Sequence, residues 1–148
     1  MEKTDAPESH ADAPAAKRVA AAVVHSTDEN YRVEIRAGRH RLTADEPQVI
    51  GGADAGPPPF GLLLSALGSC TVITLRMYAQ RKGWPLSDVR VRLGYEKGAE
   101  SSRITRRIAL AGDLDDAQRA RLLDVAERTP VTLAVRDGVP IATSEDRD

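Results

Sequence analysis

Residues 57–83 constrain the fold most, because they predict one long helix that is apolar on nearly every side. Three prolines suit the start of a helix, and Gly83 suits its end, after basic residues that favour the last turn. Between these marks the residues are apolar or small as far as Arg76. A helix that is apolar all round is normally buried, and the run 60–75 is short for a bilayer. We therefore expect the central helix of a soluble core.

Length and composition favour one domain and exclude several classes of function. The chain has 148 residues, a net charge of -1 and 3% aromatic residues, which argues against nucleic acid or an anionic membrane as a partner. Residues 1–17 are charged and rich in alanine and proline, so we expect a disordered tail followed by a domain over 18–148. No signal peptide or transmembrane helix is recognised, and we expect a cytoplasmic protein.

Short alternating segments flank the central helix and predict an α+β fold. The expected strands before it are 19–26, 31–36 and 39–44, and those after it are 88–95, 103–110 and 139–143. A second helix is expected over 117–128, with Asp115 as its N-cap. The predicted order is β-β-β-α-β-β-α-β. The arginines of the hairpin 88–110 are interpreted as a solvated face, and Gly68 in the central helix predicts that another backbone passes close by.

The central helix and its flanks resemble the OsmC/Ohr family, the osmotically inducible and organic hydroperoxide resistance proteins. The segments that carry the resemblance are 45–47 (Asp-Glu-Pro), 51–52 (Gly-Gly), 56–57 (Gly-Pro), 62–70 (Leu-Leu-Leu-Ser-Ala-Leu-Gly-Ser-Cys), 75–79 (Leu-Arg-Met-Tyr-Ala), 112–114 (Gly-Asp-Leu) and 126–131 (Ala-Glu-Arg-Thr-Pro-Val). The resemblance implies an α+β fold and an intertwined homodimer, in which the sheets of two chains wrap the paired central helices. It also implies a thiol peroxidase that reduces organic hydroperoxides at the dimer interface.

Cys70, the only cysteine, matches the peroxidatic cysteine of that family. Other family positions differ: Phe60 stands where the peroxidases carry a glutamate, and Thr129 stands where they carry the resolving cysteine. The family arginine lies in the first hairpin turn, where the nearest arginine here is Arg32. Arg39 is another possible neighbour of the thiol. The resemblance therefore transfers one catalytic residue, Cys70, and leaves its surroundings open.

Each of these residues also has a purely structural interpretation. A lone cysteine in an apolar helix is usually a small buried hydrophobe, and strand arginines are usually solvated. The three histidines show no metal-ligand spacing, and no phosphate-binding fingerprint is present, so we expect no metal and no cofactor.

Two functional hypotheses remain. The first is a cysteine-based peroxidase that reduces organic hydroperoxides with an external small thiol or dithiol. The second is a non-catalytic homodimer that binds a small lipophilic ligand in a pocket at its interface. The missing acid and second cysteine favour the second hypothesis, and the cysteine at this position favours the first.

Overall fold

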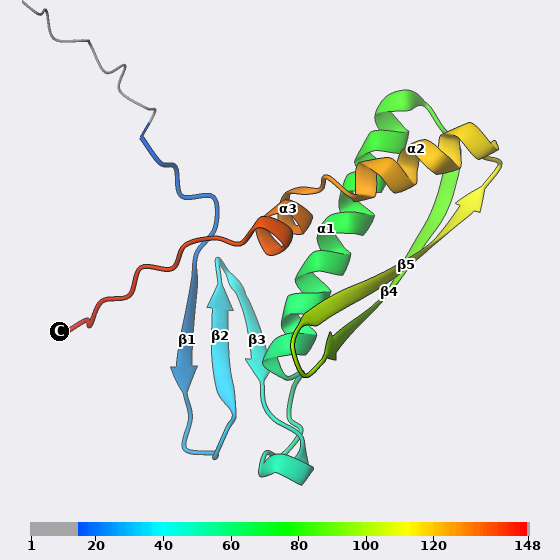
Figure 1. Ribbon diagram of the computed structural model, residues 1–148. Helices are drawn as coiled ribbons and strands as arrows, with labels where there is room; N and C mark the ends of the chain where they lie inside the picture. The colour runs from blue at the N-terminus through cyan, green and yellow to red at the C-terminus, as the bar shows by residue number, and fades with distance from the viewer. Residues whose placement is uncertain (1–14, 148) are drawn as a thin grey trace, which may run out of the picture. The chain divides into compact units, whose positions relative to one another are not determined.

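A computed structural model describes residues 15–147 of the chain (Figure 1). The residues divide into two compact units, one ending at Gly56 and the other beginning at Pro57. Most of the predicted tail, residues 1–14, lies outside the described residues, and 15–17 are exposed and have no regular secondary structure. The mixed α+β class expected from the sequence is confirmed.

The first unit is an antiparallel meander of three short strands. These are β1 (Ala22–Ser26), β2 (Val33–Ala37) and β3 (His40–Ala44), hydrogen-bonded in the order β1-β2-β3. The first two strands begin later than predicted. Val19 lies before β1 with 93% of its surface exposed, and Tyr31 belongs to the turn between β1 and β2. Val33 and Ile35, which alternate along β2 and therefore share one face, are both half-buried.

A buried carboxylate organises the loop that follows β3. Asp45 is buried, and its Oδ1 accepts a hydrogen bond from the backbone N–H of Glu46 at 2.8 Å. Its Oδ2 accepts from the N–H groups of Ala53 and Ala55, each at 3.1 Å. These bonds, that of Ala55 first, lower the pKa of Asp45. The loop also requires Gly52, because a Cβ there would lie 1.8 Å from the carbonyl oxygen of Glu46.

The second unit is built on α1 (Pro59–Lys82), the long helix predicted from the sequence. Pro59 starts the helix at N1, and Gly83 ends it in the left-handed conformation, at φ 68°. One stripe of the helix is buried, formed by Leu67, Gly68, Thr71, Leu75 and Ala79. Within one chain the rest of the helix is not covered, because Phe60, Ile73 and Met77 are each more than half exposed.

By length and composition alone, α1 could also cross a membrane, and it is the one described helix with this property. The sequence-based exclusion considered the run 60–75 alone, whereas the helix continues to Lys82. One side of α1 packs against β4 and contacts two further helices. Soluble core helices pass the same length and composition test, and the packing of α1 agrees with that role.

A long hairpin covers one side of α1 (Figure 1). It consists of β4 (Leu86–Lys97) and β5 (Ser102–Gly112), paired antiparallel along their lengths. Alternate residues face inward, so Val89 and Val91 of β4 and Ile108 and Leu110 of β5 join or border the core. Gly68 faces this hairpin: a Cβ there would lie 2.9 Å from Cδ1 of Leu93. The close neighbour of Gly68 is thus a side chain and not the predicted backbone.

Two shorter helices complete the unit. α2 (Asp116–Ala126) begins with the predicted N-cap Asp115, which forms a capping box with Gln118. α3 (Pro130–Asp137) begins directly afterwards, with Thr129 as its N-cap residue. The core joins α1, β4 and α2 through the buried side chains Leu75, Ala79, Val89, Leu114, Leu122 and Ala126.

The predicted final strand over 139–143 is wrong for the described chain. This segment follows α3 without regular secondary structure, and Val139 and Ile141 are 63% and 90% exposed. A strand needs a neighbouring edge to satisfy its backbone groups, and neither described sheet includes this segment. The observed order is β-β-β-α-β-β-α-α, leaving aside the short 3-10 turn η1 (Gln48–Ile50).

Candidate functional site

Cys70 lies near the middle of α1 and is partly buried. The next residue, Thr71, is fully buried, and its hydroxyl donates a hydrogen bond to the carbonyl oxygen of Leu67 at 2.8 Å. Ser65 and Ser69 on the exposed side donate in the same manner to carbonyl oxygens one turn earlier. The thiol therefore lies at the border between the buried stripe of α1 and its exposed face.

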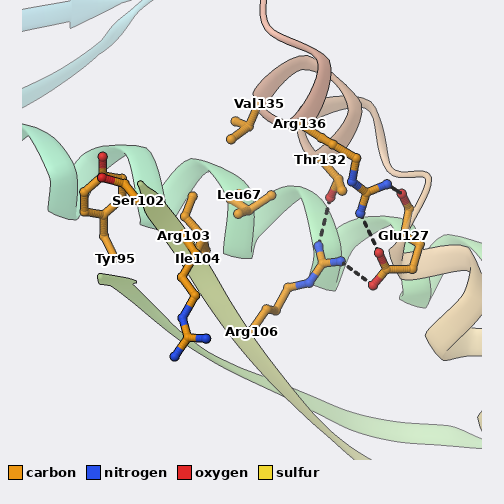
Figure 2. A pocket seen from close by; sticks show the side chains of 10 residues that line it. All are labelled: Leu67, Tyr95, Ser102, Arg103, Ile104, Arg106, Glu127, Thr132, Val135 and Arg136. Carbon is orange, nitrogen blue, oxygen red and sulfur yellow. Dashed lines mark hydrogen bonds and ion pairs between the residues drawn. The ribbon is translucent and has the colours of Figure 1, made fainter. Parts of the chain in front are cut away.

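A largely buried arginine, Arg106, links α1 to the other two helices, and Figure 2 shows its hydrogen bonds to Thr132 and Glu127. Nη1 of Arg106 donates to Oγ1 of Thr71 at 3.0 Å and to Oγ1 of Thr132 at 2.8 Å. Nη2 donates to the carbonyl oxygen of Ala126 at 2.9 Å and to Oε1 of Glu127 at 3.2 Å. The Arg106 side chain is only 11% exposed. A guanidinium removed from water needs such partners, and here it connects β5 with all three helices.

Arg106 was not predicted as a site residue, because the arginines of this hairpin were interpreted as one solvated face. The alternation of β5 places Ile104, Arg106, Ile108 and Leu110 on the inner face, whereas Arg107 points outward and is exposed. A charge in phase with an apolar series is therefore the sequence signal that could have identified this residue.

Thr129, at the position of the family's resolving cysteine, belongs to the same network. It is fully buried, and its Oγ1 lies 2.6 Å from Oγ1 of Thr132. Thr132 in turn accepts the hydrogen bond from Arg106. Of the predicted neighbours of Cys70, Thr129 is thus linked by way of Thr132 and Arg106 to Thr71, the residue after Cys70.

Phe60 is placed elsewhere on α1, in its first turn. Its ring is 55% exposed and packs on Tyr95 of β4, with ring centroids 4.3 Å apart. Phe60 is an apolar packing residue in this chain, and it supplies no carboxylate.

Arg32 and Arg39 belong to the first unit, whereas Cys70 belongs to the second. Nε of Arg32 donates to Oε1 of Glu34 at 3.2 Å, and Nη1 donates to Oε1 of Glu29 at 3.2 Å. The hydrogen bond with Glu34 and the charge of Glu29 raise the pKa of Arg32. Arg39 is exposed in the β2–β3 turn. The role of either arginine beside the thiol remains a prediction.

A pocket of about 520 Å³ lies next to the Arg106 network. Its lining includes Leu67 of α1, one helical turn before Cys70, together with Arg106, Glu127 and Thr132. Arg136 also lines it, and this side chain donates to the carbonyl oxygen and to Oε2 of Glu127. Within residues 15–147 no cluster of three or more metal-ligating side chains is found.

Comparison with known proteins gives a family match and several matches of fold. A family model described as OsmC-like protein matches residues 51–144, more than half of the chain. A search of curated proteins found no significant match.

Three solved structures illustrate the likeness of fold. A protein from Psychrobacter arcticus 273-4, titled a putative osmotic stress induced and detoxification response protein, is 18% identical with a TM-score of 0.66, over 76% of this chain and 85% of that one. An organic hydroperoxide resistance protein OsmC from Legionella pneumophila is 18% identical with a TM-score of 0.61, over 82% and 92%. The organic hydroperoxide resistance protein OhrB of Bacillus subtilis is 17% identical with a TM-score of 0.56, over 80% and 91%.

The family model spans Cys70, the Arg106 network and Thr129, and the solved structures of the Legionella and Bacillus proteins match the fold over 80% or more of this chain. The resemblance identified from the sequence is thereby confirmed. The chain belongs to the OsmC-like family.

Proposed function

We propose that this protein is a thiol peroxidase in which Cys70 reduces organic hydroperoxides and an external small thiol restores the cysteine. The observation that carries the proposal is the position of Cys70. The only cysteine of the chain stands at the family's peroxidatic position, partly buried on α1 and one turn from a pocket. The reductant fits a reducing compartment such as the cytoplasm, and the acting molecule is a homodimer.

The chemistry needs one thiol in the protein and two in solution. The Cys70 thiolate attacks the terminal oxygen of the hydroperoxide, so that an S–O bond forms as the O–O bond breaks. The alkoxide leaves and takes a proton to become an alcohol. A first external thiol converts the sulfenic acid to a mixed disulfide and releases water, and a second releases Cys70 as the thiol. The sum is one hydroperoxide and two thiols giving alcohol, disulfide and water.

A cation near the sulfur favours the thiolate over the thiol. Arg106 becomes a candidate for this role beside Arg32 and Arg39, because its guanidinium lies 3.0 Å from the hydroxyl of Thr71, the neighbour of Cys70. Thr129 cannot resolve the sulfenic acid. We therefore expect turnover to depend on a monothiol, and the enzyme to be inactivated at high peroxide through further oxidation of sulfur.

The test is the intact mass of the protein after one equivalent of an alkyl hydroperoxide. Wild type should gain one oxygen, and Cys70→Ser should gain nothing. Thr129→Cys restores the family residue and should lose two hydrogens as a disulfide forms, provided that the two Cα atoms can come within about 7 Å. A wild-type protein that stays reduced and unchanged in mass contradicts the peroxidase proposal.

The second candidate function is binding without catalysis. It is favoured by Phe60 and Thr129, which replace the family's acid and resolving thiol, and by the pocket of about 520 Å³ beside the Arg106 network. Under this hypothesis Cys70 is a packing residue, and the thiol should react with a labelling reagent only after denaturation.

A further inference from the structure

We propose that the pocket next to the Arg106 network binds an apolar molecule that ends in a single carboxylate. The carboxylate would lie at the end formed by Arg106 and Arg136, and the apolar part would extend along Leu67 and Val135. The inference narrows the ligand class of the proposed function. It does not depend on the reactivity of Cys70, because binding is measurable without peroxide.

The charge of the pocket is concentrated at one end (Figure 2). Arg106 and Arg136 both bind Glu127: Arg106 through Oε1 at 3.2 Å, and Arg136 through Oε2 and the backbone carbonyl oxygen. Two guanidiniums therefore share one carboxylate, which leaves one positive charge in excess. A third arginine of the lining, Arg103, is paired with Glu96 at 2.6 Å and points away from this end.

The rest of the pocket lining combines apolar side chains with Ser102 and Arg103. Leu67 and Val135 lie between the charged end and the far end, where Ile104 and the ring of Tyr95 complete the lining with Ser102 (Figure 2). A volume of about 520 Å³ falls within the range of small-molecule sites, about 300–1,000 Å³. The pocket thus suits a ligand with a charged head and an apolar body, bound in one orientation.

The Glu127 side chain indicates which kind of anion fits between Arg106 and Arg136. The group held between the two guanidiniums is the carboxylate of Glu127, so the spacing of the arginines suits a planar, two-oxygen anion. The Glu127 side chain is 58% exposed, and Arg136 is 49% exposed. The Arg136–Glu127 pair is therefore a weakly held surface contact, which an incoming carboxylate can share or replace.

Binding of sodium octanoate, 1-octanol and octyl phosphate to the full-length protein tests this inference, with backbone amide NMR shifts as the readout. Octanoate should bind about tenfold more tightly than octanol, because only the acid forms charge-assisted hydrogen bonds. Its largest shifts should map to the pocket residues. The variant Cys70→Ser should bind octanoate as wild type does.

Two charge variants should move the octanoate affinity in opposite directions. Arg136→Ala should weaken it about tenfold without changing octanol binding, since it removes one charged donor. Glu127→Gln should strengthen it, because it removes the competing carboxylate and its charge. Arg107→Ala is the matched control: this arginine lies beside Arg106 in sequence but is exposed on the outer face of β5, and its loss should change nothing.

Three results would overturn the inference. Equal binding of octanoate and octanol would show that the arginines do not recognise a head group. Tighter binding of octyl phosphate than of octanoate would assign the pocket to a phosphate ligand. Shifts that map outside the pocket, or none at millimolar octanoate, would leave the pocket without this function. None of these results decides whether Cys70 reacts with peroxide, which the mass measurement tests separately.

Discussion

Arg106 joins four parts of the second unit through one side chain: Thr71 on α1, Ala126 at the end of α2, Glu127 after it and Thr132 on α3. Buried polar groups of this kind stabilise a fold only while every member is satisfied. In the residues that the structure describes, no buried side-chain nitrogen or oxygen lacks a partner. The network therefore fixes where α3 begins relative to α1, next to the Cys70 turn.

Replacing Arg106 should destabilise the protein strongly. Arg106→Met removes the guanidinium donor from Thr71, Thr132 and the carbonyl oxygen of Ala126, at a cost of about 2 kcal/mol or more in the free energy of unfolding. Urea unfolding measures this cost. Arg107→Met, at the neighbouring outward position, should change the stability by about 0.5 kcal/mol or less. Equal effects of the two substitutions would show that the hydrogen bonds of Arg106 contribute no more to stability than an exposed arginine does.

Because of Asp45, the stability of the loop 45–56 should depend on pH in the acidic range. Its pKa is lowered in the folded protein, so its contribution to stability is complete above its ordinary pKa of about 3.9 and is lost as the pH falls through the lower folded value. Asp45→Asn should reduce the melting temperature at pH 6, and the difference from wild type should shrink as the pH falls below about 4.

Asp54→Asn is the control for this measurement, since Asp54 is an exposed residue of the same loop. Asparagine also tolerates its left-handed backbone, at φ 55°. Its melting temperature should follow that of wild type at every pH. A constant difference between wild type and Asp45→Asn down to pH 2 would contradict the role assigned to the Asp45 carboxylate.

At the scale of elements, the packing of α1 on β4 should tolerate a small side chain at position 68 but not a large one. The neighbour of an added Cβ is the end of the flexible Leu93 side chain at 2.9 Å, which can move by a few tenths of an ångström. Gly68→Ala should therefore be close to neutral, since alanine also favours the helix by about 1 kcal/mol over glycine. Gly68→Leu should overpack the α1–β4 contact and cost about 1–3 kcal/mol. Chemical denaturation of both variants measures the difference, and equal stabilities would show that α1 and β4 are not closely packed here.

The elements with a strong periodic pattern could be predicted from the sequence. α1 and the hairpin of β4 and β5 were predicted with ends close to those observed, and the N-cap at Asp115 is confirmed by its capping box. One proline is compatible with two outcomes: Thr129-Pro130 can end the helix expected over 117–128 or start another. The chain starts α3 there, because proline fits the first position of a helix.

The candidate site could be predicted only in part, because its partners come from distant elements. Cys70 and Thr129 were found through the family motifs, but Arg106 reaches Thr71 across 35 residues of sequence. No local sequence pattern predicts which arginine of a strand will find hydrogen-bond partners at the end of one helix and the start of another. The alternation of β5 could have identified the face on which Arg106 lies, but only tertiary packing supplies its hydrogen-bond partners.

At the scale of the whole molecule, α1 presents an apolar face that the described chain leaves exposed. Ile73 and Met77 lie four residues apart on this face and are 56% and 64% exposed, and Ser69 and Ala66 precede them. These residues lie one turn apart, or nearly so, and form a continuous strip along the helix. Small and apolar residues in this arrangement allow two helices to approach closely. The family resemblance implies that the partner is the α1 helix of a second copy.

We therefore expect a homodimer in solution, with more than about 2,000 Å² buried in total if the interface is obligate. Light scattering after size exclusion should give twice the monomer mass at micromolar concentration. Ile73→Glu places a charge at the centre of the exposed strip and should produce a monomer or an aggregate, since an unpaired buried charge is costly. Leu123→Glu is the control, because Leu123 is 46% exposed on α2 and lies away from the strip in sequence. A dimer that Ile73→Glu leaves intact would show that this face of α1 does not form the interface. A monomeric wild type would show in addition that the site around Cys70 has to function within one chain.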